Sequence, residues 1–129
     1  MSGTFEAGTS VALRAVHRVP WAKDAEREPH EHDYRVEVIV QASSVDDRGV
    51  VVDLEALDAA LSAVVRMLQG QDLDTTIATE HAEAVTVEIL ARWIHGRLAD
   101  AVSSAGADAL TVRVWESPDA FGGFRGAVG

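Results

Sequence analysis

Three histidines in the first third of the chain have the residue type and the spacing of a metal site. His30 and His32 are separated by one residue, so in an extended segment both side chains leave the same face. His17 ends an earlier extended segment and would lie opposite them on an antiparallel neighbour. Three imidazoles with a fourth position open are a donor set of catalytic zinc sites. A His-x-His pair is also common in charged surface loops, so the spacing alone leaves both interpretations open.

A carboxylate and two helix-start residues are further candidates. Glu116 ends an apolar segment, where it is either a solvated rim residue or an anchor for a cationic or amidine-like group, since a carboxylate accepts two N–H hydrogen bonds. Asp53 and Thr86 stand where helix caps are expected. We expect His81, in a polar loop, and His95, near the polar side of a helix, to be solvated.

The segments that must position these residues have the patterns of four strands and two helices. Apolar residues alternate with period two in residues 11–17, 34–42, 110–116 and, more weakly, 121–127. Apolar residues recur at helical spacing after Asp53, and Gly70 is a plausible end of this helix. A second helical pattern begins at about Val87. Residues 50–52 are expected to extend the sheet briefly, and residues 71–84 to form a polar connection.

This order of elements predicts an α+β fold. We expect an antiparallel four-stranded sheet with both helices on one face. Such a sheet has two open edges, which are an aggregation hazard. Joining subunits edge to edge into a barrel would remove these edges.

Composition limits the setting and the partners. The 129 residues predict one domain, residues 1–129, and the net charge of −10 makes nucleic acid and anionic membranes poor partners. The chain has no cysteine, which excludes disulfides and thiolate chemistry. It has neither a signal-peptide pattern nor a run of about 20 apolar residues, so we expect a soluble, cytoplasmic protein.

Taken in order, these pieces resemble the family of 6-pyruvoyl-tetrahydropterin synthase and 6-carboxy-tetrahydropterin synthase. In that family the pattern begins with a strand that ends in histidine, followed by HGH and an aromatic residue. A helix start and a DHxxLN segment come next. A second helix start, PTxEN, and a strand that ends in glutamate complete the pattern. Here the corresponding pieces are VHRVP at 16–20, HEHDY at 30–34, VVDL at 51–54, LQGQDLD at 68–74, VTVEI at 85–89 and VWE at 114–116. The resemblance runs through nearly the whole chain.

The resemblance implies a fold, an assembly and a site. The family has the tunnelling fold (T-fold), in which sheets of neighbouring subunits join into a barrel, commonly in hexamers with active sites at subunit interfaces. The residues that match His17, His30 and His32 hold zinc there. Those that match Glu116 and Thr86 grip the amino-pyrimidine edge of a pterin. The implied partners are therefore a pterin-like small molecule and further copies of the chain.

Three departures concern proton transfer. The family's catalytic cysteine falls on Glu26, and its Asp-His pair falls on Gln69 and Gly70. Gln69 cannot titrate and Gly70 has no side chain, whereas the standard reaction needs acid–base groups. A fourth departure is Glu31, which replaces the glycine of HGH. We therefore predict that the standard synthase reaction is absent.

Three functions stay open after these departures. The first is a synthase homologue that binds a pterin-like or purine-like molecule without the standard reaction. The second is a lyase with altered chemistry on a dihydropterin, with zinc and with Glu26 as base; some branches of the family use a glutamate to cleave the side chain of dihydroneopterin triphosphate. The third is a structural subunit that keeps only assembly. The sequence does not decide whether zinc is bound.

Overall fold

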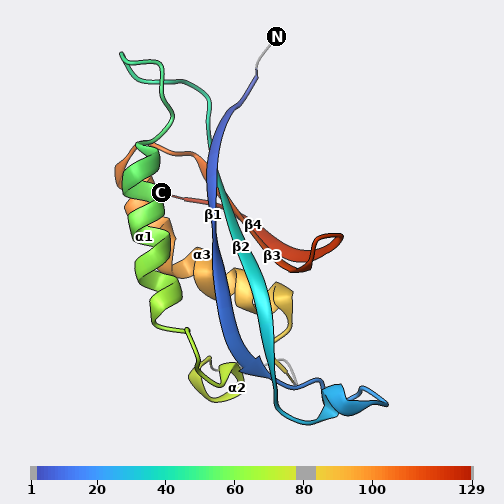
Figure 1. The fold of residues 1–129 in the computed structure, drawn as a ribbon. Helices are drawn as coiled ribbons and strands as arrows, with labels where there is room; N and C mark the ends of the chain where they lie inside the picture. The colour runs from blue at the N-terminus through green and yellow to red at the C-terminus, as the bar shows by residue number, and fades with distance from the viewer. Residues whose placement is uncertain (1–2, 78–83, 129) are drawn as a thin grey trace.

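A single antiparallel sheet organises the protein. The computed structural model describes residues 3–77 and 84–128. Its strands are β1 (Phe5–His17), β2 (His30–Ala42), β3 (Ala109–Ser117) and β4 (Ala120–Ala127), hydrogen-bonded in the order β1-β2-β3-β4 (Figure 1). The predicted α+β class with four antiparallel strands is confirmed. β1 and β2 are longer than their alternation predicted, because backbone pairing continues from Phe5↔Ala42 to His17↔His30.

The helices are α1 (Leu54–Arg66), the single turn α2 (Leu73–Thr76) and α3 (Val87–Ser104), with a 3₁₀ turn, η1, at Ala25–Arg27. α1 packs against β1, and α3 packs against β3 and β4, so both long helices cover one face of the sheet (Figure 1). The predicted caps are present. The Asp53 carboxylate accepts the N–H groups of residues 55 and 56, and the Thr86 hydroxyl accepts that of residue 89 at 3.2 Å.

The core lies between the sheet and these helices. In β2 the alternating residues Tyr34, Val36, Val38 and Val40 are all buried, which confirms the face predicted from their spacing. They meet apolar side chains of α1 and α3, including Leu61 and Ile94. Burial of each such aliphatic side chain contributes about 1.5–3 kcal/mol relative to exposure. The same strand face continues past Tyr34 to His32 and His30, so the core fixes where these histidines point.

Three local expectations were wrong. Residues 50–52 form no strand, and residues 51 and 52 are bends. The connection after Gly70 contains α2, because Asp72 caps it and Leu73 is fully buried. α1 itself ends at Arg66, and Gly70 follows with a φ of +72°, a conformation that glycine adopts without strain.

His95 is buried rather than solvated. Its Nε2 lies 3.2 Å from the carbonyl oxygen of Gly126, and its ring packs edge-on against Phe124. An added Cβ on Gly126 would lie 3.1 Å from that ring, so the glycine allows the close approach of α3 to β4. His81 lies outside the described residues. No helix in the described part of the chain is long and apolar enough to cross a membrane.

Candidate metal and ligand site

The structure brings the three predicted histidines together at one end of the sheet. His17 is directly opposite His30 in the β1–β2 register, and His32 is two residues further along β2 on the same face. One ring nitrogen from each residue can be chosen so that all three lie within 4.8 Å of one another. The rings are also close, with centroids of His17 and His30 4.6 Å apart. This spacing suits three ligands of a single metal ion.

The second ring nitrogen of His30 and of His32 is held by a backbone carbonyl. Nδ1 of His30 donates to the carbonyl of Glu28 at 3.0 Å, and Nε2 of His32 donates to the carbonyl of Glu116 at 3.1 Å. A carbonyl only accepts, so these nitrogens carry the protons, and in a neutral ring the other nitrogen keeps its lone pair. Such outer contacts hold imidazole ligands in the required tautomer and orientation.

Two nitrogens of this cluster are buried without a partner. Among the described residues, the Nε2 atoms of His17 and His30 have no hydrogen bond. Burial, followed by the nearby charges of His30 and His32, lowers the pKa of His17, which favours its neutral form. Buried polar atoms are nearly always satisfied in native proteins. Buried ring nitrogens that lack partners and lie close to one another therefore fit a metal ion.

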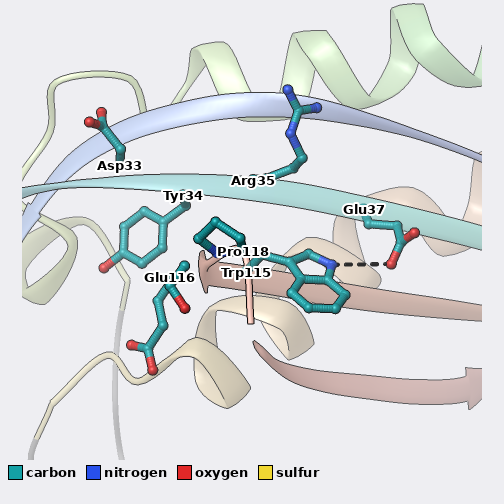
Figure 2. Close-up of a pocket in the computed structure, with 8 residues that line it drawn as sticks. Asp33, Tyr34, Arg35, Glu37, Trp115, Glu116 and Pro118 are labelled. Carbon is teal, nitrogen blue, oxygen red and sulfur yellow. Dashed lines mark hydrogen bonds between the residues drawn. The ribbon is translucent and has the colours of Figure 1, made fainter. Parts of the chain in front are cut away.

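A pocket of about 650 Å³ lies where β3 ends beside β2, and three residues of the sheet face opposite the histidines, Asp33, Arg35 and Glu37, are part of its lining. The side chain of Glu116 lines it next to the phenol of Tyr34 (Figure 2). Burial, and then the carboxylates of Glu116 and Asp74, raise the pKa of Tyr34, so its hydroxyl keeps its proton. Because the backbone carbonyl of Glu116 bonds His32, one residue links the pocket to the histidine cluster.

Aromatic residues that sequence reasoning did not single out form another wall of the pocket. The indole N–H of Trp115 donates to Glu37 at 3.2 Å, and its ring lies 4.6 Å from that of Phe121. Arg113 lies over the Phe121 ring, and its guanidinium is 3.5 Å from the same glutamate. The cross-strand register that unites these residues left no local signal in the sequence.

Thr86 stabilises the start of α3 and does not line the pocket. It is half-buried, caps α3 through its hydroxyl, and is not one of the residues that line the pocket of Glu116.

The positions that depart from the family pattern lie apart from the histidines. Glu26 belongs to η1, in an exposed loop that protrudes beyond the ends of β1 and β2 (Figure 1). The amide oxygen of Gln69 accepts the backbone N–H of Arg14 at 3.3 Å, and the N–H of Gly70 bonds the Arg14 carbonyl at 2.8 Å. Both residues therefore support the outer edge of β1.

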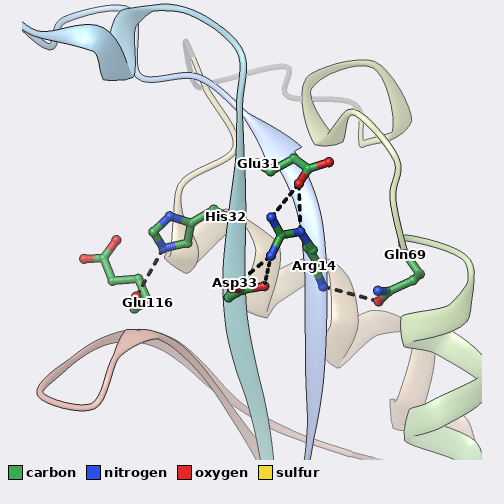
Figure 3. A network of polar contacts seen from close by, with 6 residues as sticks. All are labelled: Arg14, Glu31, His32, Asp33, Gln69 and Glu116. Carbon is green, nitrogen blue, oxygen red and sulfur yellow. Dashed lines mark hydrogen bonds and ion pairs between the residues drawn. The ribbon is translucent and has the colours of Figure 1, made fainter.

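The side chain of Glu31 also forms its contacts away from the histidine cluster. Its carboxylate pairs with Arg14 at 2.6 Å, and the same guanidinium pairs with Asp33 at 3.0 Å (Figure 3). These three residues alternate with the histidines along their strands, so they leave the opposite face of the sheet. Glu31 thus changes the charge of the outer face without adding a ligand.

Comparison with known proteins identifies the fold family. The sequence matches the family of 6-pyruvoyl tetrahydropterin synthase over residues 9–127. No curated protein matches it. Among solved structures, the Caenorhabditis elegans 6-pyruvoyl tetrahydropterin synthase is similar with a TM-score of 0.72 and 22% identity, over 97% of this chain and 97% of that one.

Two Plasmodium enzymes have the same fold. The Plasmodium falciparum 6-pyruvoyl tetrahydropterin synthase has a TM-score of 0.76 at 14% identity, over 99% of this chain and 100% of that one. The Plasmodium vivax enzyme, solved as a mutant of a catalytic glutamate, has a TM-score of 0.76 at 12% identity, over 98% and 99%. Identities this low establish the fold alone. The match over residues 9–127 shows that the chain belongs to the 6-pyruvoyl tetrahydropterin synthase family.

Proposed function

We propose that this chain binds a pterin-like heterocycle, with a purine as the related option, and does not catalyse the standard reaction of its family. The observation that carries the proposal is the contrast between two sets of residues. Glu116 lines a pocket and accepts a hydrogen bond from His32 through its backbone carbonyl, whereas Gln69 and Gly70 offer no group that titrates.

Glu116 supplies the recognition of the ring. Its carboxylate accepts two parallel hydrogen bonds from the amino-pyrimidine edge of a pterin, each of the charge-assisted kind that contributes about 1.5–3 kcal/mol. The protonated Tyr34 hydroxyl beside it offers a donor and an acceptor. We assign Thr86 to the support of this pocket, because it fixes the start of α3.

The histidine cluster is proposed to hold zinc. His17 and His30 would bind through Nε2, and His32 through Nδ1, the nitrogens that keep their lone pairs. A bound zinc ion would supply Lewis acidity to an oxygen or nitrogen of the ligand. Within the chain, the backbone hydrogen bonds of His30 and His32 keep these two rings oriented toward His17.

The same residues argue against the standard reaction. Proton transfer to and from a substrate side chain requires titratable groups within hydrogen-bond reach. Tyr34 keeps its proton because its pKa is raised, and Glu26 lies in an exposed loop. The ligand is therefore expected to be bound and released unchanged.

One observation favours a second function, a lyase with altered chemistry on a dihydropterin. The Plasmodium vivax relative is described with a catalytic glutamate. In this alternative, Glu26 replaces the family cysteine as base beside the zinc ion. It requires the loop of residues 18–29 to fold back toward the histidines.

Assembly completes the proposal. β1 and β4 each have one neighbouring strand in the sheet, and both are edges on which a second copy could pair. We propose a homo-oligomer in which sheets join into a barrel, with the hexamer as the family's common form. The net charge of −10 disfavours nucleic acid and anionic membranes as partners, and we assign the protein to the cytoplasm.

Ligand binding to matched variants tests the proposal. A panel of pterins and purines is titrated calorimetrically into wild type, Glu116→Gln and Asp119→Asn. Glu116→Gln should weaken binding of the best ligand by about 10- to 100-fold, the effect of losing charge-assisted hydrogen bonds. Asp119→Asn removes a carboxylate three residues away and should bind like wild type. If no member of the panel binds wild type, the proposal fails.

A further inference from the structure

Asp74 is a carboxylate near the histidine cluster that the proposed function does not use. It lies in α2 and falls on the asparagine of the family's DHxxLN pattern, so this chain has a negative charge where that pattern has a neutral amide. Its side chain is only 21% exposed. Water screens a partly buried charge less than an exposed one, so Asp74 can act on groups around it.

Backbone contacts hold α2 against the end of β1, next to His17 (Figure 1). Val16 forms a parallel β-bridge with Asp72, and its N–H donates to the carbonyl of the residue before Asp72 at 2.9 Å. Asp74 follows two residues after this bridge, and its carboxylate lies 3.9 Å from Nε of Arg18. Contacts to the residues on both sides of His17 therefore place Asp74 beside that histidine.

The charge of Asp74 acts on both the histidine cluster and the neighbouring phenol. Burial lowers the pKa of His17, the other two histidines add to this effect, and Asp74 opposes it. Burial also raises the pKa of Tyr34, with Glu116 and then Asp74 as further causes. The carboxylate therefore stabilises positive charge at the position of the three histidines and disfavours negative charge beside them.

The two oxygens of Asp74 have different contacts. Oδ1 accepts the backbone N–H of Val85 at 3.2 Å, next to the residue that caps α3. Oδ2 is the oxygen that lies 3.9 Å from the half-exposed guanidinium of Arg18. An ion pair this long and this exposed contributes little, so it compensates the carboxylate only in part.

We propose that Asp74 is an electrostatic partner of the metal site, which raises the affinity of His17, His30 and His32 for a divalent cation without binding the ion itself. Three neutral imidazoles leave the charge of such an ion uncompensated, and a buried charge is costly without a counter-charge. Asp74 supplies that counter-charge from outside the group of ring nitrogens that lie within 4.8 Å of one another. The inference rests on the proposed zinc site and adds a residue to it.

Zinc affinities of charge variants test the inference. A chromophoric chelator competes for zinc with the zinc-loaded, full-length protein at about pH 8, where imidazoles with a pKa near 6.5 are neutral. Asp74→Asn keeps an oxygen for the N–H of Val85 and loses only the charge. It should weaken zinc binding about 10-fold, the lower end of what loss of an outer contact costs at a metal site. Asp47→Asn makes the same charge change in the exposed loop at the other end of β2 and should bind zinc like wild type.

Two further variants separate charge from structure, and circular dichroism checks that each is folded. Asp74→Ala loses the charge and the hydrogen bond to Val85, and it should weaken zinc binding at least as much as Asp74→Asn. Arg18→Gln removes the cation that competes for the carboxylate, so it should strengthen zinc binding, by about threefold.

The outcomes distinguish this inference from the proposal on which it rests. Wild-type affinity in Asp74→Asn, with or without weaker binding in Asp74→Ala, would leave Asp74 with a structural role at most and overturn the inference, while the zinc site stands. If wild type itself binds no zinc, the proposed zinc site fails and the inference fails with it.

Discussion

Two regions at the same end of the sheet differ in how their polar groups are arranged. On the helix-covered face, His17, His30 and His32 converge, and two of their nitrogens are buried without a hydrogen-bond partner. On the opposite face and the outer edge, Arg14 binds two carboxylates and contacts the Gln69 segment, so the polar groups there are satisfied within the protein (Figure 3).

The difference in hydrogen-bond satisfaction separates the residues expected to bind a metal ion from the positions expected to transfer protons. Buried groups that lack partners are costly unless something binds them, so the histidine face is arranged to receive a metal ion. Exposed ion pairs such as those of Arg14 contribute little to stability. Because their groups are already paired within the protein, they do not require a ligand. The residues expected to bind are thus preorganised, whereas the positions expected to move protons have become parts of the structure.

The largest expected effect is on the metal. His30→Ala removes one of three ligands and should weaken zinc binding more than about 100-fold, beyond the 10- to 100-fold that loss of a supporting contact costs. Metal content of protein purified without chelator, measured by mass spectrometry, should fall from about one zinc per chain to nearly none. Glu31→Gln is the matched control, because that carboxylate is bound to Arg14, and it should keep its zinc. Equal zinc in wild type and His30→Ala would remove the histidines from the metal site.

The packing of α3 on β4 should show a smaller effect, on stability. A Cβ added to Gly122 would lie 2.5 Å from Val87 Cγ2 and 2.9 Å from the Glu88 carboxylate. Gly122→Ala should therefore displace the start of α3 and lower the free energy of unfolding by about 1–3 kcal/mol. Gly96→Ala, within α3 and in open space, should instead raise it by up to about 1 kcal/mol. Thermal or denaturant unfolding distinguishes the two; equal shifts would contradict the packing described here.

The smallest effect is expected at Glu26. Its side chain is exposed in η1, so Glu26→Gln should change neither the affinity for a pterin nor the zinc content by more than about twofold, as for most exposed surface substitutions. Calorimetry on the zinc-loaded variant measures the affinity, and mass spectrometry of protein purified without chelator measures the zinc content. Turnover of a dihydropterin by wild type that disappears in Glu26→Gln would instead establish the lyase alternative.

Much of the fold was predictable because its signals are local. The alternation of Tyr34, Val36, Val38 and Val40 gave the buried face of β2, and Asp53 and Thr86 gave both helix starts. The histidine cluster was predictable for the same reason: period two places His30 and His32 on one face.

The rest depends on contacts between distant parts of the chain. The partnership of Trp115 with Glu37, and the engagement of Glu31 by Arg14, follow from the register of three strands. His95 was expected near the polar side of its helix, yet its ring packs in the interface of α3 with β4 and contacts the carbonyl of Gly126. No pattern within a single element contains that information.

The central claim is that the chain binds a pterin-like molecule and leaves it unchanged. The direct measurement is incubation of zinc-loaded protein with an equal amount of 7,8-dihydroneopterin, followed by mass spectrometry of the recovered ligand beside a protein-free sample. We predict a ligand that is bound in wild type, bound weakly in Glu116→Gln, and recovered intact in both. Conversion of the ligand by wild type, at a rate above that of the protein-free sample, would contradict the claim.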